Sequence, residues 1–504
     1  MLGAVGLLGF FIAMVLSWVR WPVPSIHDEF SHLLLADTLR HGRLSNPTPE
    51  AWQAFQSFHT ILVPTYSSKY PLGPGALLAL GWVLFGTPTA GLWLGAGFCS
   101  AAITWTLAAV VPRRWALIGG MLIALHPAMH TEWSRSYMNG WLTATAASII
   151  VGSVVRLRKR NSIFASIILG FGIGLMSLCR PFEGLIFTAL CLGSLVWHWG
   201  IEGQITARRL MTASLGGLPC ITLAIIVIAA HNFATTGSWL CMPYQLHEAQ
   251  YAVAPLFITQ ATQAPEMATT GENSMPALFE KINSWSVGEY SRYTGVAGFL
   301  RGVFQRLAMI RDFWGWWLAI VPCFAIVLWR VSSLVRWSVL GVISLVTATS
   351  ITHWSAPHYL APIVPWLAIL ATLALRRVAC LAKIRPRFIV ATVAAYSLLS
   401  IVWVMTESHA AESQEWSMRR FKIEAQLNGI GGKHLVFVHY RENHNVHQEW
   451  VYNLANIAES QIIWARSCRD DWRQMVIDKY GSSRSIWETD ADSPSTLIRS
   501  ACKE

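Results

Sequence analysis

The chain opens with MLGAVGLLGFFIAMVLSWVR (Met1–Arg20) and continues with WPVPSIHDEF (Trp21–Phe30). The stretch from Met1 to Val19 carries no charge and is long enough to cross about 30 Å of hydrocarbon. It lacks the basic start and the small-residue cleavage site of a signal peptide, so we interpret it as an uncleaved anchor. Two carboxylates, Asp28 and Glu29, follow it closely. Acidic groups beside a bilayer are costly and usually functional, so this pair is the first candidate for chemistry.

The composition is that of a membrane protein and not of a soluble enzyme. Of the 504 residues, 54% are hydrophobic and only 13% are charged, and 26 are tryptophans. The net charge of +11 is accounted for by basic loops, and no nucleic-acid motif is present, so we expect no nucleic-acid partner. The nine cysteines form no CxxC pair, which argues against a zinc site or a disulfide framework.

Hydropathy predicts about eleven membrane spans, each long enough to cross the hydrocarbon core. They lie near residues 2–19, 88–111, 115–129, 139–156, 162–179, 184–200, 210–231, 312–329, 337–352, 359–375 and 388–405. Alternate connections are basic, at residues 113–114, 156–160, 208–209, 330–336 and 376–387. Cytoplasmic loops carry the excess of Lys and Arg, so we expect a polytopic protein of a bacterial inner membrane with its N-terminus in the cytoplasm.

This topology divides the chain into a membrane domain, residues 1–406, and a tail, residues 407–504, with outer loops at 20–87 and 231–311. Residues 73–86 are apolar but too short to span, so we expect a helix at the outer interface. Residues 28–41 have the pattern of an amphipathic helix with Phe30, Leu33 and Leu34 on one side. Strand-length apolar runs at 434–440, 462–464 and 485–487, with a helical pattern at 470–480, predict a small periplasmic α/β domain.

Polar side chains gather at the predicted outer ends of the spans. They are Asp28, Glu29, His32, Lys69, Tyr70, His126, His130, Glu132, Arg180, Glu183, His353, His358 and Tyr359. An apolar bundle with such a rim suits a lipid-borne substrate that contains phosphate, because cations hold the phosphate at the interface while the tail lies along the helices. A nearby carboxylate can deprotonate an incoming hydroxyl as a general base.

At this point the sequence resembles the C-type membrane glycosyltransferases, in particular the protein O-mannosyltransferase and aminoarabinose-transferase superfamily. These proteins begin with one span and a long outer loop that opens on Asp-Glu, as His27-Asp28-Glu29-Phe30 does here. Their Lys-Pro turn before an interfacial helix is similar to Ser68-Lys69-Tyr70-Pro71. Their late Arg-Tyr-x-x-Pro segment is similar to His358-Tyr359-Leu360-Ala361-Pro362. The resemblance covers residues 1 to about 405.

The resemblance implies transfer of a sugar from a polyprenyl-phosphate carrier to an acceptor outside the membrane, with inversion at the anomeric carbon. Asp28 would be the base, Glu29 would orient it or the substrate, and Lys69 would contact the donor phosphate. Two positions depart from the family. Many relatives have an acidic residue where this chain has Met138-Asn139-Gly140-Trp141, with Glu132 the nearest carboxylate, and His358 stands where an arginine is usual, with Arg180 a candidate for its role.

Each site residue also has a structural interpretation. Asp28 and Glu29 fit the first turn of a helix, Lys69 fits a snorkelling interfacial lysine, and Arg180 with Glu183 fits a local i, i+3 ion pair. The spacing of His27, Asp28 and His32 is not that of a helical two-histidine metal site, so we assign no metal ligands. The segment 242–251 is an ordinary packed loop or, with Tyr244 and His247, part of an acceptor site.

Two other functions remain open from the sequence. A transporter or flippase of lipid-linked sugars is less favoured, because the middles of the spans are almost free of charge and show no repeat. A catalytically silent scaffold is opposed only by the Asp-Glu pair. The sequence does not identify the sugar, a metal requirement, or whether the acceptor is a glycan, a lipid or a protein.

Overall fold

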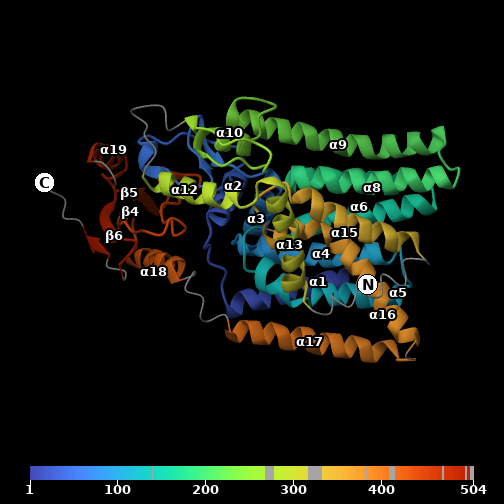
Figure 1. Cartoon of the computed structure of the whole chain (residues 1–504). Coiled ribbons are helices and arrows are strands. Elements are labelled where there is room, and N and C mark those ends of the chain that lie inside the picture. The colour runs from blue at the N-terminus through green and yellow to red at the C-terminus, as the bar shows by residue number, and fades with distance from the viewer. Residues whose placement is uncertain are drawn as a thin grey trace.

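The computed structural model of the chain describes residues 1–138, 140–266, 277–315, 332–381, 383–407, 415–467, 470–493 and 497–499. Figure 1 shows a bundle of long helices that run in roughly the same direction, with a small α/β domain at one end of it. Between the two lie the short helices and strands of the outer segments. The fold is therefore a helical membrane bundle with a small sheet domain, as predicted.

The bundle contains the long apolar helices of the chain. Six of them, among the residues that the structure describes, are long and apolar enough to cross a membrane: Leu2–Val19 (α1), Thr89–Leu107 (α4), Gly140–Lys159 (α6), Pro181–Ile201 (α8), Ala207–Thr236 (α9) and Pro357–Leu381, which joins the 3-10 helix η4 (Pro357–Ile363) to α16 (Val364–Leu381). Four more are apolar but shorter or less completely described: Leu72–Phe85 (α3), Ile163–Cys179 (α7), Ser333–Thr349 (α15) and α17 (Pro386–Glu407).

The predicted count of about eleven spans is not confirmed. The predicted span at 312–329 lies mostly outside the described residues. The span predicted at 115–129 is wrong in extent, because α5 covers only Arg113–Ala124, 12 residues. At 1.5 Å per residue, such a helix is about 18 Å long and cannot cross the hydrocarbon core by itself. The chain after α5 turns through the short π-helix η2 (Met129–Trp133) instead.

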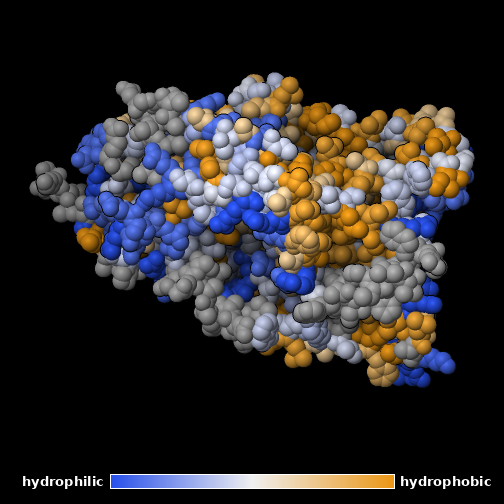
Figure 2. Space-filling view, in the orientation of Figure 1, coloured by the Kyte–Doolittle hydropathy of each residue, from blue (hydrophilic) through white to orange (hydrophobic). Residues whose placement is uncertain are grey.

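The surface of the bundle differs from that of the rest of the molecule. Figure 2 shows apolar side chains over the helical bundle and hydrophilic ones over the C-terminal domain. Many large apolar side chains of the bundle helices are exposed, for example Leu185 on α8 and Leu223 and Ile225 on α9. An exposed apolar surface of this size marks contact with lipid or another protein, and here it surrounds helices of membrane-spanning length.

The first outer segment folds into a helix and a three-stranded antiparallel sheet. Helix α2 covers His27–Arg40, and strands β1 (Asn46–Pro47), β2 (Thr60–Ile61) and β3 (Thr65–Ser68) pair in the order β1-β3-β2, with the 3-10 helix η1 at Trp52–Phe55. The predicted helix is present, but its predicted one-sided apolar face is wrong. Both apolar and polar side chains of α2 are buried, Leu34 and Asp37 among them. The reason is that α2 is covered by α3 on one side and by the C-terminal domain on another.

The second outer segment, predicted as a loop at 231–311, is largely helical. Helix α9 extends to Thr236, and α10 (Pro243–Tyr251), α12 (Ala277–Ser291) and α13 (Gly295–Trp314) follow it. The alternative that residues 242–251 form an ordinary packed loop is therefore wrong. Pro243 stands at the first position of α10, where its fixed φ favours helix and its missing N–H costs nothing.

The C-terminal domain contains a four-stranded sheet in the order β5-β4-β6-β7. Strand β4 (His434–His439) pairs in parallel with β5 (Ile462–Arg466) and β6 (Ser485–Asp490), and β7 (Ile498–Arg499) is antiparallel to β6. Helices α18 (Glu415–Ile430) and α19 (Asp470–Tyr480) and the 3-10 helix η7 (Ile457–Glu459) complete it. The predicted strands and the helix at 470–480 are confirmed. Helix α18 and strand β7 were not predicted from the sequence.

The C-terminal domain and the first outer segment share one core. Leu34 of α2, together with Phe55 and Tyr66, packs in the same apolar cluster as Leu435 and Phe437 of β4. Hydrogen bonds cross the same boundary, where the Tyr66 hydroxyl donates to the Asn453 carbonyl at 2.7 Å. The domain is therefore held directly over the start of α2.

Glycines set how closely α3 and α4 approach each other. A Cβ atom added at Gly81 of α3 would lie 2.1 Å from the backbone nitrogen of Gly91 on α4 and 2.6 Å from the carbonyl carbon of Ala90. Backbone atoms cannot rotate away, so these two helices fit only with glycine at this crossing. Because α3 starts just after Lys69-Tyr70, this packing also fixes the position of those two side chains.

We expect Gly81→Ala to destabilise the protein by about 1–3 kcal/mol, because the added methyl group forces the two helices apart. Gly193→Ala is the matched control, since Gly193 lies in α8 and its added Cβ meets nothing within 4 Å. That substitution should be neutral or slightly stabilising, because alanine favours helix over glycine. Thermal unfolding of the detergent-solubilised proteins compares the two, and equal stability would contradict the close approach.

Candidate active site

A cavity of about 290 Å³ lies where the bundle, the outer segments and the C-terminal domain meet. Its lining comes from every outer part of the chain. The polar and aromatic residues around it are His27, Asp28, Phe58, His59, Lys69, Tyr70, His247, Glu248, Tyr251, Phe279, Asn283, Trp285, Ser286, Trp354, Ser355, His358, Tyr359 and His447. Of the residues predicted from the sequence, the cavity brings together Asp28, Lys69, Tyr70, His247, His358 and Tyr359.

Hydrogen bonds between α2 and the first sheet aim Asp28 at this cavity. The Ser31 hydroxyl, one turn further along α2, donates to the His59 carbonyl at 2.6 Å, and its oxygen lies 2.7 Å from the Ser68 hydroxyl. The Ser68 hydroxyl in turn accepts from the backbone N–H of Tyr70 at 3.1 Å. These buried contacts lock the first turn of α2 against the end of β3, so Asp28 and Tyr70 face each other.

The Asp28 carboxylate accepts a hydrogen bond from the Tyr70 hydroxyl. His59 completes the group, with its Nδ1 3.4 Å from Asp28 Oδ2 and 3.0 Å from the Tyr70 oxygen. Burial would raise the pKa of Asp28, but His59, Lys69 and the Tyr70 hydroxyl outweigh it and hold this pKa well below its ordinary value. Asp28 is therefore an ionised carboxylate that faces the cavity, with its side chain 20% exposed.

His59 holds its place with a left-handed backbone, at a φ of 63°. Such a conformation is uncommon for a residue other than glycine and is often found at functional sites. Burial and the neighbouring Lys69 lower the pKa of His59, so its imidazole is neutral at neutral pH. A neutral imidazole both donates and accepts, which suits a group that orients the Asp28–Tyr70 pair.

Lys69 provides the cation of the cavity. It follows β3 and precedes α3, and its ammonium lies 5.5 Å from the centre of the Tyr70 ring. Burial lowers the pKa of Lys69, while the charges of Glu248 and Asp28 act in the opposite direction. Burial also raises the pKa of Glu248. The cavity lining therefore contains one ammonium group whose charge interacts with two carboxylates.

Glu29 does not line the cavity. Its side chain is buried and accepts three backbone hydrogen bonds, from Ser25 at 2.7 Å, Ile26 at 3.2 Å and Tyr137 at 2.9 Å. The first two form the cap of α2, and the third ties that cap to the segment before α6. Burial, opposed by these hydrogen bonds, raises the pKa of Glu29 to about 7. The helix-capping interpretation thus describes the contacts of Glu29, whereas Asp28 faces the cavity.

The segment His358-Tyr359-Leu360-Ala361-Pro362 reaches the cavity from the side of the helical bundle. His358 and Tyr359 lie in η4, and both line the cavity. Arg180, between α7 and α8, places its guanidinium 4.2 Å from the centre of the Tyr359 ring and 3.8 Å from Glu183. Arg180 and Glu183 therefore form the expected ion pair behind Tyr359 and are not part of the lining.

The second outer segment contributes α10. His247 is 6% exposed, and among the described residues neither of its ring nitrogens has a hydrogen-bond partner. A buried polar atom without a partner is costly, so these nitrogens are donors and acceptors available to a ligand. The same holds for Nε2 of His27, whose Nδ1 lies 3.0 Å from the Tyr452 hydroxyl.

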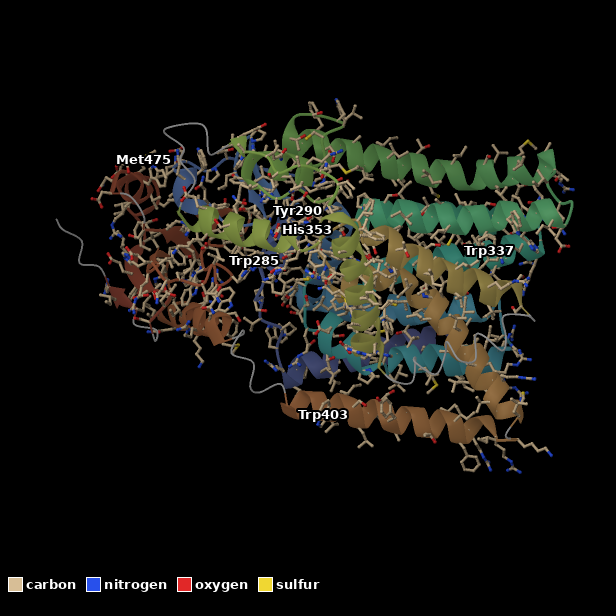
Figure 3. The ribbon with its side chains drawn as sticks, in the orientation of Figure 1. Trp285, Tyr290, Trp337, His353, Trp403 and Met475 are labelled. Carbon is tan, nitrogen blue, oxygen red and sulfur yellow. The ribbon has the colours of Figure 1, made fainter. Side chains whose placement is uncertain are left out.

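The C-terminal domain closes the outer side of the cavity. His447 comes from the connection between β4 and β5 and packs edge-on against Trp285 of α12, with 4.5 Å between the ring centres. Trp285 also lies 5.4 Å from Trp354. Figure 3 shows Trp285 at the junction between the bundle and the C-terminal domain. His59, Trp285 and His447 were not predicted from the sequence, since no spacing links them to Asp28. Glu248 belongs to the segment 242–251, which was predicted as a possible part of an acceptor site.

Two predicted site residues lie elsewhere. Glu132 lines a separate cavity of about 890 Å³ with Asp312, Tyr396 and Trp403, and it is not among the residues that line the cavity of Asp28. Tyr244 lines a small third cavity with Pro71 and Ser177. Asn139 lies outside the described residues. Within the described part of the chain, no group of three His, Cys, Asp or Glu residues is arranged to hold a metal ion.

Comparison with known proteins identifies the fold. No known protein family matches the sequence, and no curated protein matches it either. The solved structures with a similar fold include those of two proteins. The oligosaccharyltransferase of Archaeoglobus fulgidus in the apo form aligns over 96% of this chain and 69% of its own, with 12% identity and a TM-score of 0.52. ArnT from Cupriavidus metallidurans, bound to undecaprenyl phosphate, aligns over 97% and 92%, with 12% identity and a TM-score of 0.51.

Both of these proteins are C-type membrane glycosyltransferases. The resemblance predicted from the sequence is therefore confirmed at the level of the fold. It also extends to the C-terminal domain, because the alignments cover nearly the whole chain.

The buried Glu29 predicts an unusual pH dependence of stability. The pKa of Glu29 in the folded protein, about 7, lies above its ordinary value of 4.5, so the folded state keeps the proton to higher pH. The protonated Glu29 therefore contributes to the free energy of unfolding, and this contribution is fully present below pH 4.5. It is lost as the pH rises to about 7, because the free energy of unfolding falls by roughly 1.4 kcal/mol per pH unit over this range.

We expect Glu29→Gln to remove this slope, since an amide does not titrate, and to lower the stability at low pH because it offers only one acceptor oxygen. Glu202→Gln, at an exposed position, should retain the slope. Unfolding curves between pH 4.5 and 7.5 measure both effects. An unchanged slope in Glu29→Gln would show that another group causes it.

Proposed function

We propose that the protein is an integral membrane glycosyltransferase that moves a sugar from a polyprenyl-phosphate donor to an acceptor on the outer face of the membrane. One observation carries the proposal: an ionised Asp28 and the half-buried ammonium of Lys69 line one cavity at the polar end of an apolar helical bundle. The similar fold of two glycosyltransferases, one of them solved with undecaprenyl phosphate, supports the same class of donor.

The reaction follows from the two charged groups. A hydroxyl of the acceptor enters beside Asp28, which takes its proton as the oxygen attacks the anomeric carbon. The bond from that carbon to the phosphate oxygen breaks, and the polyprenyl phosphate leaves with the electron pair. A single displacement of this kind inverts the anomeric carbon. Lys69 stabilises the negative charge that develops on the leaving phosphate.

The remaining side chains hold these groups in place. The Tyr70 hydroxyl and His59 fix the orientation of Asp28, so its free lone pairs face the cavity. Because the site lies between apolar helices and a folded polar domain, the isoprenoid tail can stay in lipid while the acceptor arrives from water. A transporter would instead need ionisable groups near the middle of its spans.

Asp28→Asn should lower sugar transfer by at least 10²-fold, because the amide keeps the size of the side chain but cannot accept the proton. Tyr70→Phe should retain measurable activity and move the acidic limb of the pH profile to higher pH, since the pKa of Asp28 rises when the hydroxyl is lost. Transfer is measured with purified protein, a polyprenyl-phosphate sugar and envelope fractions as the acceptor.

Asp312→Asn is the matched control, because Asp312 is an exposed carboxylate outside this cavity. It should transfer sugar at the rate of the unmodified protein. Normal turnover by Asp28→Asn would remove Asp28 from the mechanism.

Lys69→Ala should weaken binding of the donor more than binding of the acceptor, because the ammonium contacts the phosphate and not the incoming hydroxyl. The KM values for the two substrates measure the difference, with at least a tenfold rise expected for the donor. Lys422→Ala, at an exposed position on α18, controls for a general loss of positive charge. An equal rise in both KM values for Lys69→Ala would contradict the phosphate contact.

A further inference from the structure

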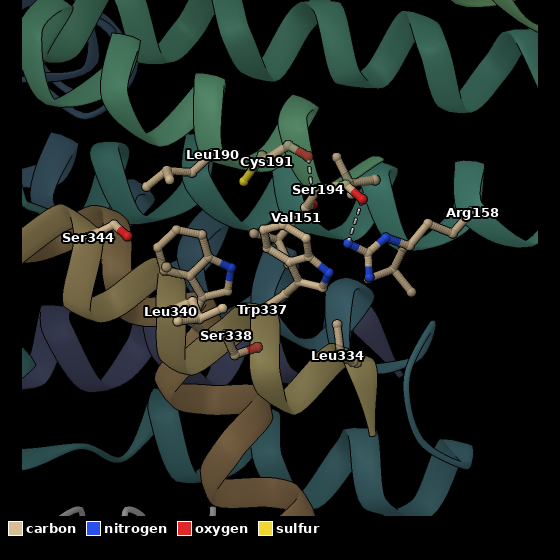
Figure 4. A pocket seen from close by; sticks show the side chains of 14 residues that line it. Val151, Arg158, Leu190, Cys191, Ser194, Leu334, Trp337, Ser338, Leu340 and Ser344 are labelled. Carbon is tan, nitrogen blue, oxygen red and sulfur yellow. Dashed lines mark hydrogen bonds between the residues drawn. The ribbon is translucent and has the colours of Figure 1, made fainter. Parts of the chain in front are cut away.

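A second kind of site lies at the other end of the bundle from the candidate active site. A cavity of about 170 Å³ is enclosed by α6, α8, α15 and α16. Its walls are mainly apolar, and its polar side chains are Arg158, Cys191, Ser194, Trp337, Ser338 and Ser344. Figure 4 shows the guanidinium of Arg158 at one end of this cavity and Leu190 with Ser344 at the other.

Arg158 differs from the neighbouring basic residues because one of its buried N–H groups makes no hydrogen bond within the described residues. Arg156 donates to the carbonyls of Gly152 and Trp105, both at 2.8 Å, and stacks on the Trp105 ring at 3.6 Å. Lys159 donates to a backbone carbonyl of the α4–α5 connection. Arg158 instead donates to the Ser194 carbonyl at 3.1 Å, while its buried Nε has no hydrogen-bond partner among the described residues.

A second polar group in the same cavity is also unused. The Ser338 side chain is 1% exposed, and its hydroxyl has no hydrogen-bond partner in the described part of the chain. Native proteins seldom bury such groups without a partner, so these two unused polar groups point to a ligand that accepts and donates hydrogen bonds. The lining contains no carboxylate that could neutralise Arg158.

The polarity of the cavity matches one class of molecule. Its cation stands at the end of α6, within the basic run that closes this side of the bundle, and most of the remaining wall is Val, Leu and Trp. Leu340 at the rim is 42% exposed, so the cavity opens on the apolar surface of the bundle. A ligand that fits has an anionic headgroup joined to a hydrocarbon chain and comes from the bilayer. Basic pockets between membrane helices bind anionic lipid headgroups in this way.

We propose that this cavity binds an anionic phospholipid, with its phosphate at Arg158 and the start of one acyl chain along Trp337 and Trp366. The bound lipid would link α6, α8 and α15, which otherwise leave a void at this end of the bundle. This site is separate from the glycosyl-transfer site, and its test does not depend on the proposed reaction.

The test is lipid binding by the full-length protein in detergent, followed by native mass spectrometry. Dioleoyl phosphatidylglycerol should bind at least tenfold more tightly than dioleoyl phosphatidylcholine. Arg158→Gln, which keeps a donor for the Ser194 carbonyl, should lose this preference. Arg160→Gln, two residues further in the same basic run and exposed, should keep it.

Leu190→Trp fills the cavity without touching the cation and should also abolish the preference, provided that the variant elutes as a folded protein. Equal losses in Arg158→Gln and Arg160→Gln would overturn the proposal, because they would indicate diffuse attraction to a basic surface. Inorganic phosphate and uncharged diacylglycerol are tested as two further ligands. If phosphate alone raises the melting temperature as much as phosphatidylglycerol does, the site takes a small anion and the lipid assignment is wrong.

Discussion

The structure depends on the contact between α2 and strand β3. Two buried hydroxyls, those of Ser31 and Ser68, join the helix to the sheet, and the Tyr70 hydroxyl then reaches Asp28. Because α2 is buried between the bundle and the C-terminal domain, each of its polar groups needs a partner. Glu29 finds one in the backbone before α6, and Asp37 finds one in the backbone N–H of Ala455. The polar groups of this single helix therefore hold three parts of the chain together.

This arrangement also explains the electrostatics of the cavity. The histidines that face it are buried or half-buried, and desolvation lowers the pKa of His27, His59 and His247. They are uncharged at neutral pH, so the charge of the cavity rests on Asp28, Glu248 and Lys69. The low dielectric of such a place strengthens each remaining charge interaction. Such a site selects its ligands by the positions of its few charges and by the hydrogen bonds of its uncharged imidazole rings.

The sequence predicted those features that depend on local pattern. Asp28 and Lys69-Tyr70 were found because each follows or precedes a recognisable element, and the helix at 470–480 was found because its periodicity is regular. Contacts between distant segments were not accessible. His59 meets Asp28 across 31 positions and His447 reaches the same cavity across more than 400, so no spacing rule connects them. Glu132 was chosen by closeness in sequence to Met138, whereas the chain turns through η2 and directs it to another cavity.

The helices of the second outer segment were not predicted, for a related reason. Its helices α10 and α12 are rich in polar residues and pack against other parts of the chain, so their stability comes from tertiary packing more than from an apolar stripe that can be recognised in the sequence. A similar difficulty applies to α2: its Asp37 and Thr38 are buried, although such polar residues in a sequence suggest a helix face exposed to water. Polar residues that are satisfied inside a protein look in sequence like residues that face water.

The placement of His447 has a consequence for biosynthesis. The wall that it forms follows Asp28 and Lys69 by more than 370 positions in the chain, so a translating ribosome makes it long after them. Until that wall has folded, the cavity stays open on the side that His447 covers. The chamber is therefore complete only after the C-terminal domain has packed onto the first outer segment.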